Sequence, residues 1–504
     1  MSDVKQTQEK WRAEELRAQR KARLAKMKAK SGGKKPIQTT NPNTWKITAV
    51  ILALALVITG VWAAASIGLP QRLLTAVTVG GERIKAVEVN YYYYNLLSNY
   101  GIDPNTEEGQ ATLDSPSGIE GFPTADDFIK DAATQQVQQY VLLANAAADG
   151  GVALDETDFA TIENYFASLT SSASEAGSTL DNFLITTFGV GMTRDHLDKI
   201  LQRYLLANKY AAEKQESFTF TDEEMEQFYT EHTKDYDLAS YRYFYLKAVI
   251  PDGATDEQKT AAMTEAEELA NEMMEQVKNE ATFKALCIEY AADADKEKYQ
   301  TTDASLYEDQ YYSNLSSLYA DWVFGDDRVE GDTSVVKASS GYYVLYFIER
   351  ARADFQHVNV RHILIKADKE KATEEELAKA EEKAESILAE YQAGDKTEEA
   401  FGKLAQTYSE DNAEAGGLYE NIYPGVMVEE FEDWCLDKSR KPGDTGIVQT
   451  DYGFHVMYLA GYYGADWKLN ADTDMRSESY SAYLEDLMEK NPVKSNSIGM
   501  KFVG

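Results

Sequence analysis

Histidine is rare in this sequence, so the place of each histidine is informative about possible chemistry. The 504 residues include five histidines, and two of them, His362 and His455, lie in segments that read as β-strands. A histidine can transfer a proton or hold another polar group in place. These two histidines are therefore the first candidates for a functional site.

Other kinds of chemistry are disfavoured by the spacing. His357 and His362 are five residues apart in one expected strand, so they face opposite sides and cannot share a metal ion. Ser409 and Asp411 near a histidine suggest a hydrolase, but no nucleophile elbow precedes a helix there. The sequence has no glycine-rich phosphate loop, and its two cysteines are too few for a disulfide framework or a cysteine zinc site. We expect no metal and no cofactor.

The region around these histidines repeats an earlier stretch of the chain at an offset of 112–119 residues. The matches are Phe283, Leu286, Tyr290 and Asp293 with Phe401, Leu404, Tyr408 and Asp411; Asp321-Trp322 with Asp433-Trp434; and Gly341 with Gly453. Each copy begins with a strand-like run followed by a long amphipathic helix. The first copy has Tyr243 and Tyr343 where the second has His362 and His455. The sequence therefore predicts a duplicated domain whose copies differ at the candidate site.

The second copy resembles the parvulin family of peptidyl-prolyl cis/trans isomerases over about residues 355–460. The matching motifs, in order, are Val360-Arg361-His362-Ile363-Leu364-Ile365, Phe401-x-x-Leu404, Tyr408-Ser409-x-Asp411, Gly416-Gly417-Leu418, Phe431, Pro442-Gly443 and Gly453-Phe454-His455. The resemblance implies an antiparallel sheet surrounded by helices, and catalysis of rotation about X–Pro bonds without a cofactor. The preceding region resembles the extracytoplasmic foldases of the PrsA and SurA type through its Val-Gly-Gly-Glu-Arg-Ile start at 79–84.

The resemblance also implies roles for seven residues. The catalytic set is His362, Asp411 and His455, with the two histidines hydrogen-bonded behind the site. The substrate-binding set is Leu418, Met427, Phe431 and Tyr452, of which the first three would hold the proline ring. Tyr452 occupies a position where some relatives have serine, so a hydrogen bond assigned to that serine does not carry over.

Each of these residues also has a purely structural interpretation. A histidine in a strand is commonly a hydrogen-bonded core residue, and Met427 and Phe431, four apart on an expected helix, could be ordinary core packing. Asp411 could belong to a turn. The first copy, 237–350, could be a structural spacer or a peptide-binding surface. The alternative function for the whole chain is a non-catalytic, membrane-anchored chaperone that retains a parvulin frame.

Charge and hydropathy divide the chain into a basic tail, an apolar run and an acidic bulk. Residues 1–46 contain 13 Lys and Arg against 4 Asp and Glu, whereas 47–504 contain 37 against 81. The 23 residues from Ile47 to Leu69 carry no charge and are long enough to span a membrane as a helix. The basic side is expected to stay in the cytoplasm, with the bulk outside the cell. A cleaved signal peptide is the alternative, although the 46 residues before the run are unusually many.

We predict an α+β protein with six parts. They are a cytoplasmic basic tail (1–46), a transmembrane helix (47–69), a mostly α chaperone domain (76–235), a degenerate parvulin-like domain (237–350), a parvulin isomerase domain (354–463) and a C-terminal helical tail (464–504). Within the chaperone domain we expect a hairpin turned at Gly80-Gly81 and a loop over 101–124. The acidic bulk disfavours a nucleic-acid partner. The expected partners are unfolded or newly secreted proteins with X–Pro bonds, together with the cell membrane that holds the single-pass anchor.

Overall fold

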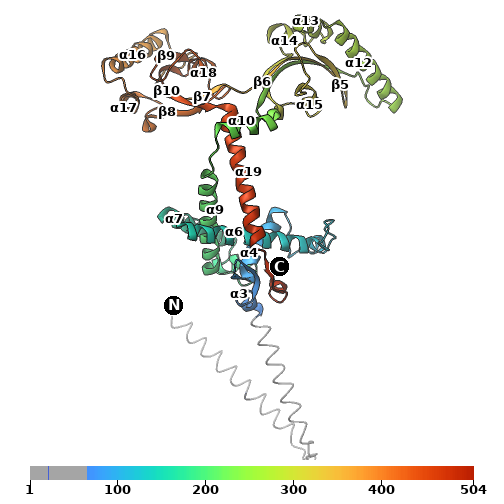
Figure 1. Ribbon diagram of the computed structural model, residues 1–504, viewed down its shortest axis with the longest axis vertical. Helices are drawn as coiled ribbons and strands as arrows, with labels where there is room; N and C mark the ends of the chain where they lie inside the picture. Colours follow the sequence, from blue (N-terminus) through green and yellow to red (C-terminus); the bar gives the residue numbers. More distant parts are fainter. Residues whose placement is uncertain (1–20, 22–64) are drawn as a thin grey trace, which may run out of the picture. The chain divides into compact units, whose positions relative to one another are not determined.

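The computed structural model describes residue 21 and residues 65–504 (Figure 1). The chain divides into two compact units, one made of Met1–Asn208 with Asn491–Gly504 and the other of Lys209–Lys490. The predicted tail, apart from residue 21, and the predicted membrane span up to residue 64 lie outside the described residues. Within the part of the chain that is described, no helix combines the length and the apolar character needed to cross a membrane.

The first unit opens with a β-hairpin, as the sequence predicted. Its elements are α3 (Leu69–Leu73), β1 (Thr75–Val79), β2 (Glu82–Lys85), α4 (Ala86–Asn99), β11 (Lys494–Ser495) and η3 (Met500–Phe502). Gly80 and Gly81 turn the hairpin, and both have positive φ angles (54° and 88°), which glycine adopts at little energetic cost. The C-terminal strand β11 pairs with β1, so the sheet order is β11-β1-β2.

Helices make up the rest of the first unit. They are α5 (Glu107–Leu113), α6 (Ala125–Gly150), α7 (Glu156–Glu175), α8 (Leu180–Phe188) and α9 (Arg194–Glu216), the last of which continues into the second unit. The prediction of a loop over 101–124 was wrong where α5 lies. The Thr106 side chain caps this helix by accepting a hydrogen bond from the Gly109 N–H, and Glu107 and Glu108 occupy the first turn.

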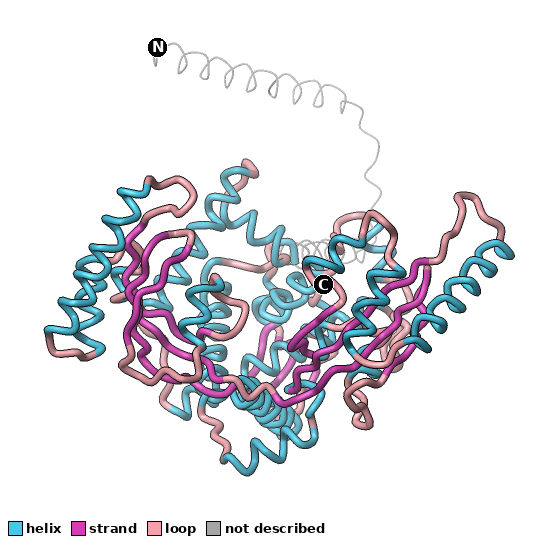
Figure 2. The backbone as a smooth tube through the Cα atoms, turned by 90° about the horizontal axis from the view of Figure 1, so that it is seen from above, coloured by secondary structure: helices cyan, strands magenta, loops and turns pink. Residues whose placement is uncertain are grey.

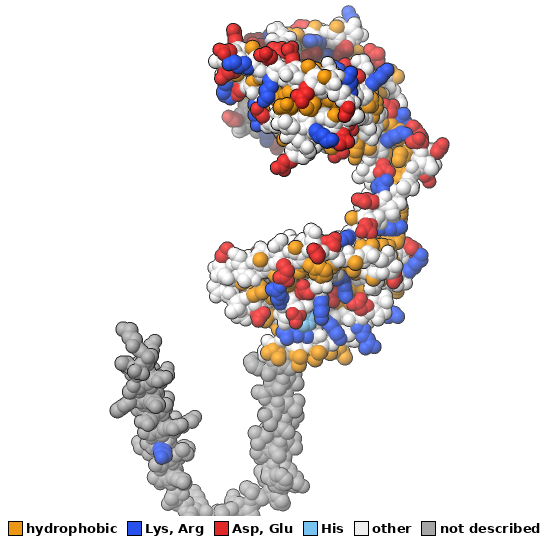
Figure 3. All heavy atoms as spheres, turned by 90° about the vertical axis from the view of Figure 1, so that its left-hand side faces the viewer, with side chains coloured by type: hydrophobic (Ala, Val, Ile, Leu, Met, Phe, Trp, Pro, Cys, Tyr) orange, Lys and Arg blue, Asp and Glu red, His pale blue; other side chains and the backbone are white. Residues whose placement is uncertain are grey.

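Four aromatic residues of the first unit lie in its core, whereas others, such as Tyr100 and Phe159, are exposed. Tyr92, Tyr93, Phe166 and Phe188 are each at most 3% exposed, so they do not form an open binding surface. Hydrophobic side chains do gather at the surface beside the point where the described chain begins, at the lower end of this unit in Figure 3.

The second unit contains two four-stranded antiparallel sheets with the same strand order, β4-β3-β6-β5 and β8-β7-β10-β9. The first copy has β3 (Asp237–Lys247), β4 (Leu306–Tyr311), β5 (Thr333–Ala338) and β6 (Gly341–Arg352). The second has β7 (Gln356–Lys366), β8 (Leu418–Ile422), β9 (Thr445–Thr450) and β10 (Gly453–Ala465). The predicted α+β class with antiparallel sheets is therefore confirmed.

Helices cover both faces of each sheet (Figure 2). In the first copy they are α12 (Asp256–Gln276), α13 (Glu280–Tyr290), α14 (Lys296–Thr301), η1 (Tyr312–Asn314) and α15 (Ala320–Val323). In the second they are α16 (Glu374–Ala393), α17 (Glu398–Tyr408), η2 (Ala413–Ala415) and α18 (Glu429–Leu436). The long helices α12 and α16 pack on one face, and the short helices α15 and α18 pack on the other. The candidate site lies on the α18 face.

A further cluster of buried side chains joins three helices outside the two copies to the two sheets. The helices are α10 (Asp222–Glu231), α11 (Thr233–Tyr236) and α19 (Asp466–Lys490). Trp467 and Ala471 pack there with Tyr236 and Ala353. This burial holds the first turns of α19, which begins at Asp466, against the two sheets.

Candidate functional site

The two candidate histidines lie together on one face of the second sheet. In the pairing of β7 with β10, His362 is opposite Met457 and His455 is opposite Leu364. The two histidines are therefore diagonal neighbours whose side chains point to the same face. Their Nδ1 atoms are 3.1 Å apart, and both rings are buried. Strand register alone brings together two residues that are 93 positions apart in the chain.

Burial keeps both histidines neutral at physiological pH. It lowers the pKa of His362 from its ordinary 6.5 to about 4, because a charged ring would lose its hydration there, and Asp411 offsets only part of this effect. Burial, together with the neighbouring His362, likewise lowers the pKa of His455 to about 4, and Asp411 offsets part of this effect. A site with two neutral imidazoles can donate and accept hydrogen bonds without carrying a net positive charge.

The contacts of His362 and His455 indicate which nitrogen of each ring carries the proton. His362 Nε2 lies 3.5 Å from Asp411 Oδ2 and makes no hydrogen bond, so a proton on Nε2 is the arrangement that the carboxylate favours electrostatically. His362 Nδ1 then accepts from His455 Nδ1–H. His455 Nε2, 2.9 Å from Thr450 Oγ1, then accepts the hydroxyl proton. Thr450, which is fully buried, was not predicted from the sequence.

Tyr419 occupies the site beside His362. It is opposite Val360 in the pairing of β8 with β7, which places its ring on the same face as His362. The two rings stack with centroids 4.9 Å apart, and the Tyr419 hydroxyl donates to Asp411 Oδ2 at 2.9 Å. Burial, together with this bond to Asp411, raises the pKa of Tyr419 to about 12. The tyrosine therefore holds the Asp411 carboxylate next to the histidines.

Leu418, which the sequence placed in the proline pocket, lies on the other face of the sheet. It is opposite Arg361 in β7. The Arg361 side chain lies on that face too, where it donates to Glu398 Oε1 (2.9 Å) and to the Gly416 carbonyl (3.0 Å). Successive strand residues alternate in direction, so Tyr419 takes the place predicted for Leu418. Leu306-Tyr307 of the first copy corresponds to Leu418-Tyr419, so the repeat itself signals an aromatic residue at this position.

Phe431 forms the apolar wall of the site. Its ring meets the His362 and His455 rings edge-to-face, with centroids 5.4 and 5.3 Å apart. Met427 packs against the same cluster, but it precedes α18, so the two residues are not i and i+4 of one helix as predicted. Instead, Glu432 accepts hydrogen bonds from three successive backbone N–H groups at 425–427 and fixes this turn.

Two other residues considered from the sequence do not contribute their side chains to this cluster. Tyr452 is 62% exposed, in the turn between β9 and β10. The Ser409 hydroxyl donates to the Asp411 carbonyl (2.6 Å) and accepts from the Leu364 N–H (3.1 Å). Ser409 is thus engaged with the backbone and not with a histidine, which gives the hydrolase interpretation no support. Across residue 21 and 65–504, no three His, Cys, Asp or Glu side chains are grouped to hold a metal ion.

In the first copy, tyrosines fill the space that corresponds to the site. Tyr243 and Tyr343 meet edge-to-face at 5.4 Å, and Tyr307 donates its hydroxyl proton to the Tyr243 hydroxyl (2.8 Å). Tyr319, at the position of Phe431, contacts Tyr343 at 5.2 Å, and Leu315 replaces Met427 in the same cluster. The first copy has the same strand order as the second, but it lacks the two imidazoles and the carboxylate of Asp411 beside them.

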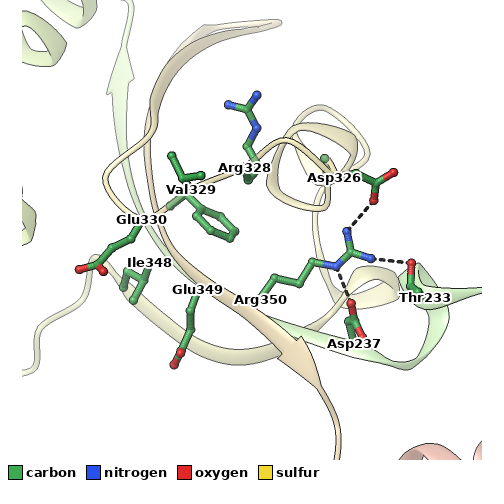
Figure 4. Close-up of a pocket in the computed structure, with 11 residues that line it drawn as sticks. Thr233, Asp237, Asp326, Arg328, Val329, Glu330, Ile348, Glu349 and Arg350 are labelled. Atoms are coloured by element: carbon green, nitrogen blue, oxygen red, sulfur yellow. Dashed lines mark hydrogen bonds and ion pairs between the residues drawn. The ribbon is translucent and has the colours of Figure 1, made fainter. Parts of the chain in front are cut away.

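A separate hollow of about 520 Å³ lies at the other end of β6 in the first copy (Figure 4). Arg350 lines it and donates to Asp237 Oδ2 (2.7 Å), the Phe324 carbonyl (2.7 Å) and Thr233 Oγ1 (2.8 Å). These bonds are directed into the protein, so the guanidinium braces the wall of the hollow. This hollow offers no counterpart to the histidine pair.

The geometry suits a non-covalent reaction on an apolar group. The cluster combines the aromatic wall of Phe431, two neutral imidazoles and a carboxylate fixed by Tyr419. It presents no activated nucleophile. Such a site can hold a ring and offer hydrogen bonds to a peptide whose geometry changes, which is what stabilisation of a twisted amide requires.

Comparison with known proteins agrees with this geometry. The family model of the PPIC-type PPIASE domain matches twice, over residues 247–351 and 343–461. The SurA chaperone of Alkalilimnicola ehrlichii is 25% identical over 345 residues, which cover 67% of this chain and 74% of that protein. The SurA chaperone of Nitrosococcus oceani is 24% identical over 52% of this chain and 59% of its own length. Foldase protein PrsA 1 of Listeria innocua is 33% identical over 105 residues, or 20% of this chain and 30% of the relative.

The duplicated sheets and the two family matches define a parvulin-type protein with tandem PPIC-type domains. Within that class, the chain is similar to SurA chaperones and to foldase protein PrsA 1.

Proposed function

We propose that this chain is an extracytoplasmic foldase that catalyses cis/trans isomerisation of X–Pro bonds in unfolded or newly secreted proteins. The contact of the Phe431 ring with the neutral His362–His455 pair carries the proposal. Rotation about an X–Pro bond is slow, with an activation energy of about 20 kcal/mol, because amide resonance must be broken. No covalent step is needed, so an apolar grip with neutral hydrogen-bonding groups is sufficient chemistry.

The proposed roles follow from the contacts. Phe431 and Met427 hold the proline ring, and Tyr419 has the role that was predicted for Leu418. His362, His455 and Asp411 shape the site through hydrogen bonds and charge, and the low pKa of both imidazoles argues against proton transfer by them at neutral pH. We keep Tyr452 in the substrate-binding set, because its ring is exposed and can contact a bound peptide.

We assign the activity to the second copy, about 354–463, and none to the first, about 237–350. In the first copy the corresponding side chains contact one another and leave no imidazole.

The experiment is a proline-peptide isomerisation assay on the full chain with two matched variants. Phe431→Ala should lower kcat/KM at least about tenfold, because the ring that would grip proline is gone. Tyr319→Ala, at the corresponding position of the first copy, should leave the rate within about twofold. Equal loss in both variants, or full activity in Phe431→Ala, would contradict the assignment.

A non-catalytic chaperone is the second candidate, and one observation favours it. His362 is 1% exposed and Phe431 is 3% exposed, so little of either side chain is open to a substrate in this conformation. If this closed arrangement persisted, the chain would slow the aggregation of unfolded proteins without accelerating proline isomerisation. The assay on the unmodified chain separates the two functions.

We further propose that residues 47–69 anchor the chain in the cell membrane as a single pass, with 1–46 in the cytoplasm and the bulk outside. The uncharged run and the basic excess before it support this topology. The helical region, about 76–235, would act as the chaperone domain, and 464–504 as a helical tail. Protease added to intact cells should remove the part after residue 70 and spare the tail. Protection of the entire chain would show that the topology is wrong.

A further inference from the structure

The described chain begins with hydrophobic side chains exposed to solvent. Ile67 is 60% exposed, and Leu69 and Leu73 of helix α3 are 39% and 61% exposed. Exposed apolar side chains that lie together commonly mark a binding surface. Figure 3 shows such side chains gathered at this end of the first unit.

Val190 extends this surface from a distant part of the sequence. It is 38% exposed and adjoins Gly191, whose backbone touches Gly68: a Cβ added to Gly68 would lie 2.3 Å from Gly191 Cα. Arg72 Nε also donates to the Gly191 carbonyl at 2.9 Å. We call Ile67, Leu69, Leu73 and Val190 the entry patch.

Cations without carboxylate partners adjoin the entry patch. Lys85 Nζ donates to the Leu73 carbonyl at 2.8 Å, and Arg83, two residues earlier in β2, shares the face of Lys85. Lys494 of β11 and Arg83 both pair in register with Thr78 of β1, so their side chains also share a face. Within residues 65–504, neither these three residues nor Arg72 forms an ion pair.

The grouping of these cations beside apolar side chains distinguishes them, because other lysines of the described chain, such as Lys247 and Lys337, also form no ion pair. The group is basic although the whole chain has a net charge of −35. Apolar side chains rimmed by free cations match the surface of a bilayer that contains anionic lipids, where the cations meet headgroups and the apolar groups meet the acyl boundary.

The position of the patch in the sequence identifies the occupant. Leu69 is both the last residue of the uncharged run and the first residue of α3. If the run is a membrane helix, the patch lies within a few residues of the bilayer surface. An unfolded client would have no reason to bind at that point rather than elsewhere on the first unit.

We propose that the entry patch and its cations dock the first unit onto the anionic surface of the bilayer. This inference rests on the proposed membrane anchor. Ile67 and Leu69 are among the last residues of that anchor, so docking would add Leu73, Val190 and the cations as a second contact and would restrain the first unit near the membrane.

The test measures lipid contact at single labelled cysteines in the full chain. Leu73→Cys reports on the patch. Tyr100→Cys is the matched control, because Tyr100 is similarly exposed (58%) and lies at the far end of α4, about 22 Å from Lys85 along the helix. Val57→Cys reports on the anchor. The native cysteines, Cys287 and Cys435, are buried and burial raises the pKa of each to about 12, so they resist labelling.

Each variant carries an environment-sensitive fluorophore in vesicles of phosphatidylcholine and phosphatidylglycerol that contain nitroxide-labelled lipid. We expect quenching at position 73 to exceed that at position 100 by at least about twofold. In Arg83→Gln/Lys494→Gln, quenching at 73 should fall toward the control, as it should in pure phosphatidylcholine.

The outcomes distinguish the docking from the anchor. Quenching at 57 but equal quenching at 73 and 100 would retain the anchor and overturn the docking. An absence of quenching at 57 would overturn both. Quenching at 73 that neither the double substitution nor neutral lipid reduces would overturn the assignment to an anionic surface. A response at 73 to an unfolded client without lipid would show that the patch is a client site.

Discussion

Acid should destabilise the second copy of the repeat more than the first, because only the second buries two neutral histidines. In the folded protein, burial lowers the pKa of His362 and of His455 to about 4, against an ordinary value of 6.5. Between these values the unfolded chain binds more protons than the folded one. The stabilisation is therefore fully present above pH 6.5 and is lost as the pH falls toward 4.

The pKa shifts set the size of the effect. At pH 5.0 each unfolded histidine lies about 1.5 pH units below its ordinary pKa while its folded counterpart remains mostly neutral. At about 1.36 kcal/mol per unit, each histidine then loses about 2 kcal/mol of stabilisation relative to pH 7.5. The pair can therefore account for up to about 4 kcal/mol, which is a large share of the stability of a domain of this size.

Hydrogen exchange read by peptide can measure this loss in the full chain. The comparison is between β7 and β10, which carry the histidines, and β3 and β6, which carry Tyr243 and Tyr343 at the matched positions. After correction for the intrinsic exchange rate, the opening free energy of β7 and β10 should fall by about 4 kcal/mol between pH 7.5 and 5.0. That of β3 and β6 should change much less.

A second variant separates this effect from a general loss of stability. His455→Leu removes one titrating ring, so the pH-dependent part should fall to about half even if the variant is less stable at pH 7.5. Equal pH dependence in the two copies, or a fall of less than about 1 kcal/mol in β7 and β10, would refute the reasoning. Either result would mean that the imidazoles are hydrated or charged in the folded protein.

Three further predictions concern neighbouring residues. Tyr419→Phe removes the hydroxyl that donates to Asp411 and should lower the free energy of unfolding by about 1 kcal/mol in urea titration, with Tyr307→Phe as the matched variant. Gly417→Ala should destabilise the second copy by several kcal/mol in the same titration, because φ is +66° and the new Cβ would lie 2.0 Å from the His362 carbonyl oxygen. Phe431→Ala should still slow the aggregation of an unfolded client in light scattering while its isomerase activity is lost; loss of both would place client binding at the isomerase site.

The sequence was sufficient for the features that depend on periodicity. Strand alternation, helix amphipathicity and the spacing of the repeat indicated two copies of one α+β domain. The same patterns placed His362 in the first strand of its copy and His455 in the last. Both strands are long and strongly patterned, so their existence and direction were predictable without knowledge of their partners.

Several residues were assigned wrongly or missed because sequence patterns do not determine how strands pair or how turns fold. Leu418 and Tyr419 are adjacent in the short strand β8, and a shift of one residue moves a side chain to the opposite face. Only the register with β7 decides which of them joins the site. Thr450 escaped notice because a turn brings its hydroxyl to His455. Helix α5 was missed because its seven residues lie in a segment rich in Gly, Pro and Ser.

The duplication itself shows how the two copies could diverge without loss of the fold. Each copy keeps an arginine in its first strand that pairs with a glutamate at the start of the following short helix, Arg242 with Glu280 (2.8 Å) and Arg361 with Glu398 (2.9 Å). These pairs lie on the face opposite the site. Successive strand residues point to opposite faces, so substitutions on the face of the site leave these two ion pairs intact.

The same alternation implies that histidines alone would not rebuild the site in the first copy. The position of Thr450 is held there by Ala338, which has no hydroxyl to fix an imidazole at Tyr343. Asp293, which corresponds to Asp411, is 98% exposed at its side chain and pairs with Lys296 at 2.9 Å, so it does not face the strand. A histidine at position 243 would therefore be buried without a carboxylate nearby. The function proposed for the second copy depends on mutually supporting residues from β7, β8, β9, β10, α18 and the loop that precedes η2. The first copy lacks that set rather than any one member of it.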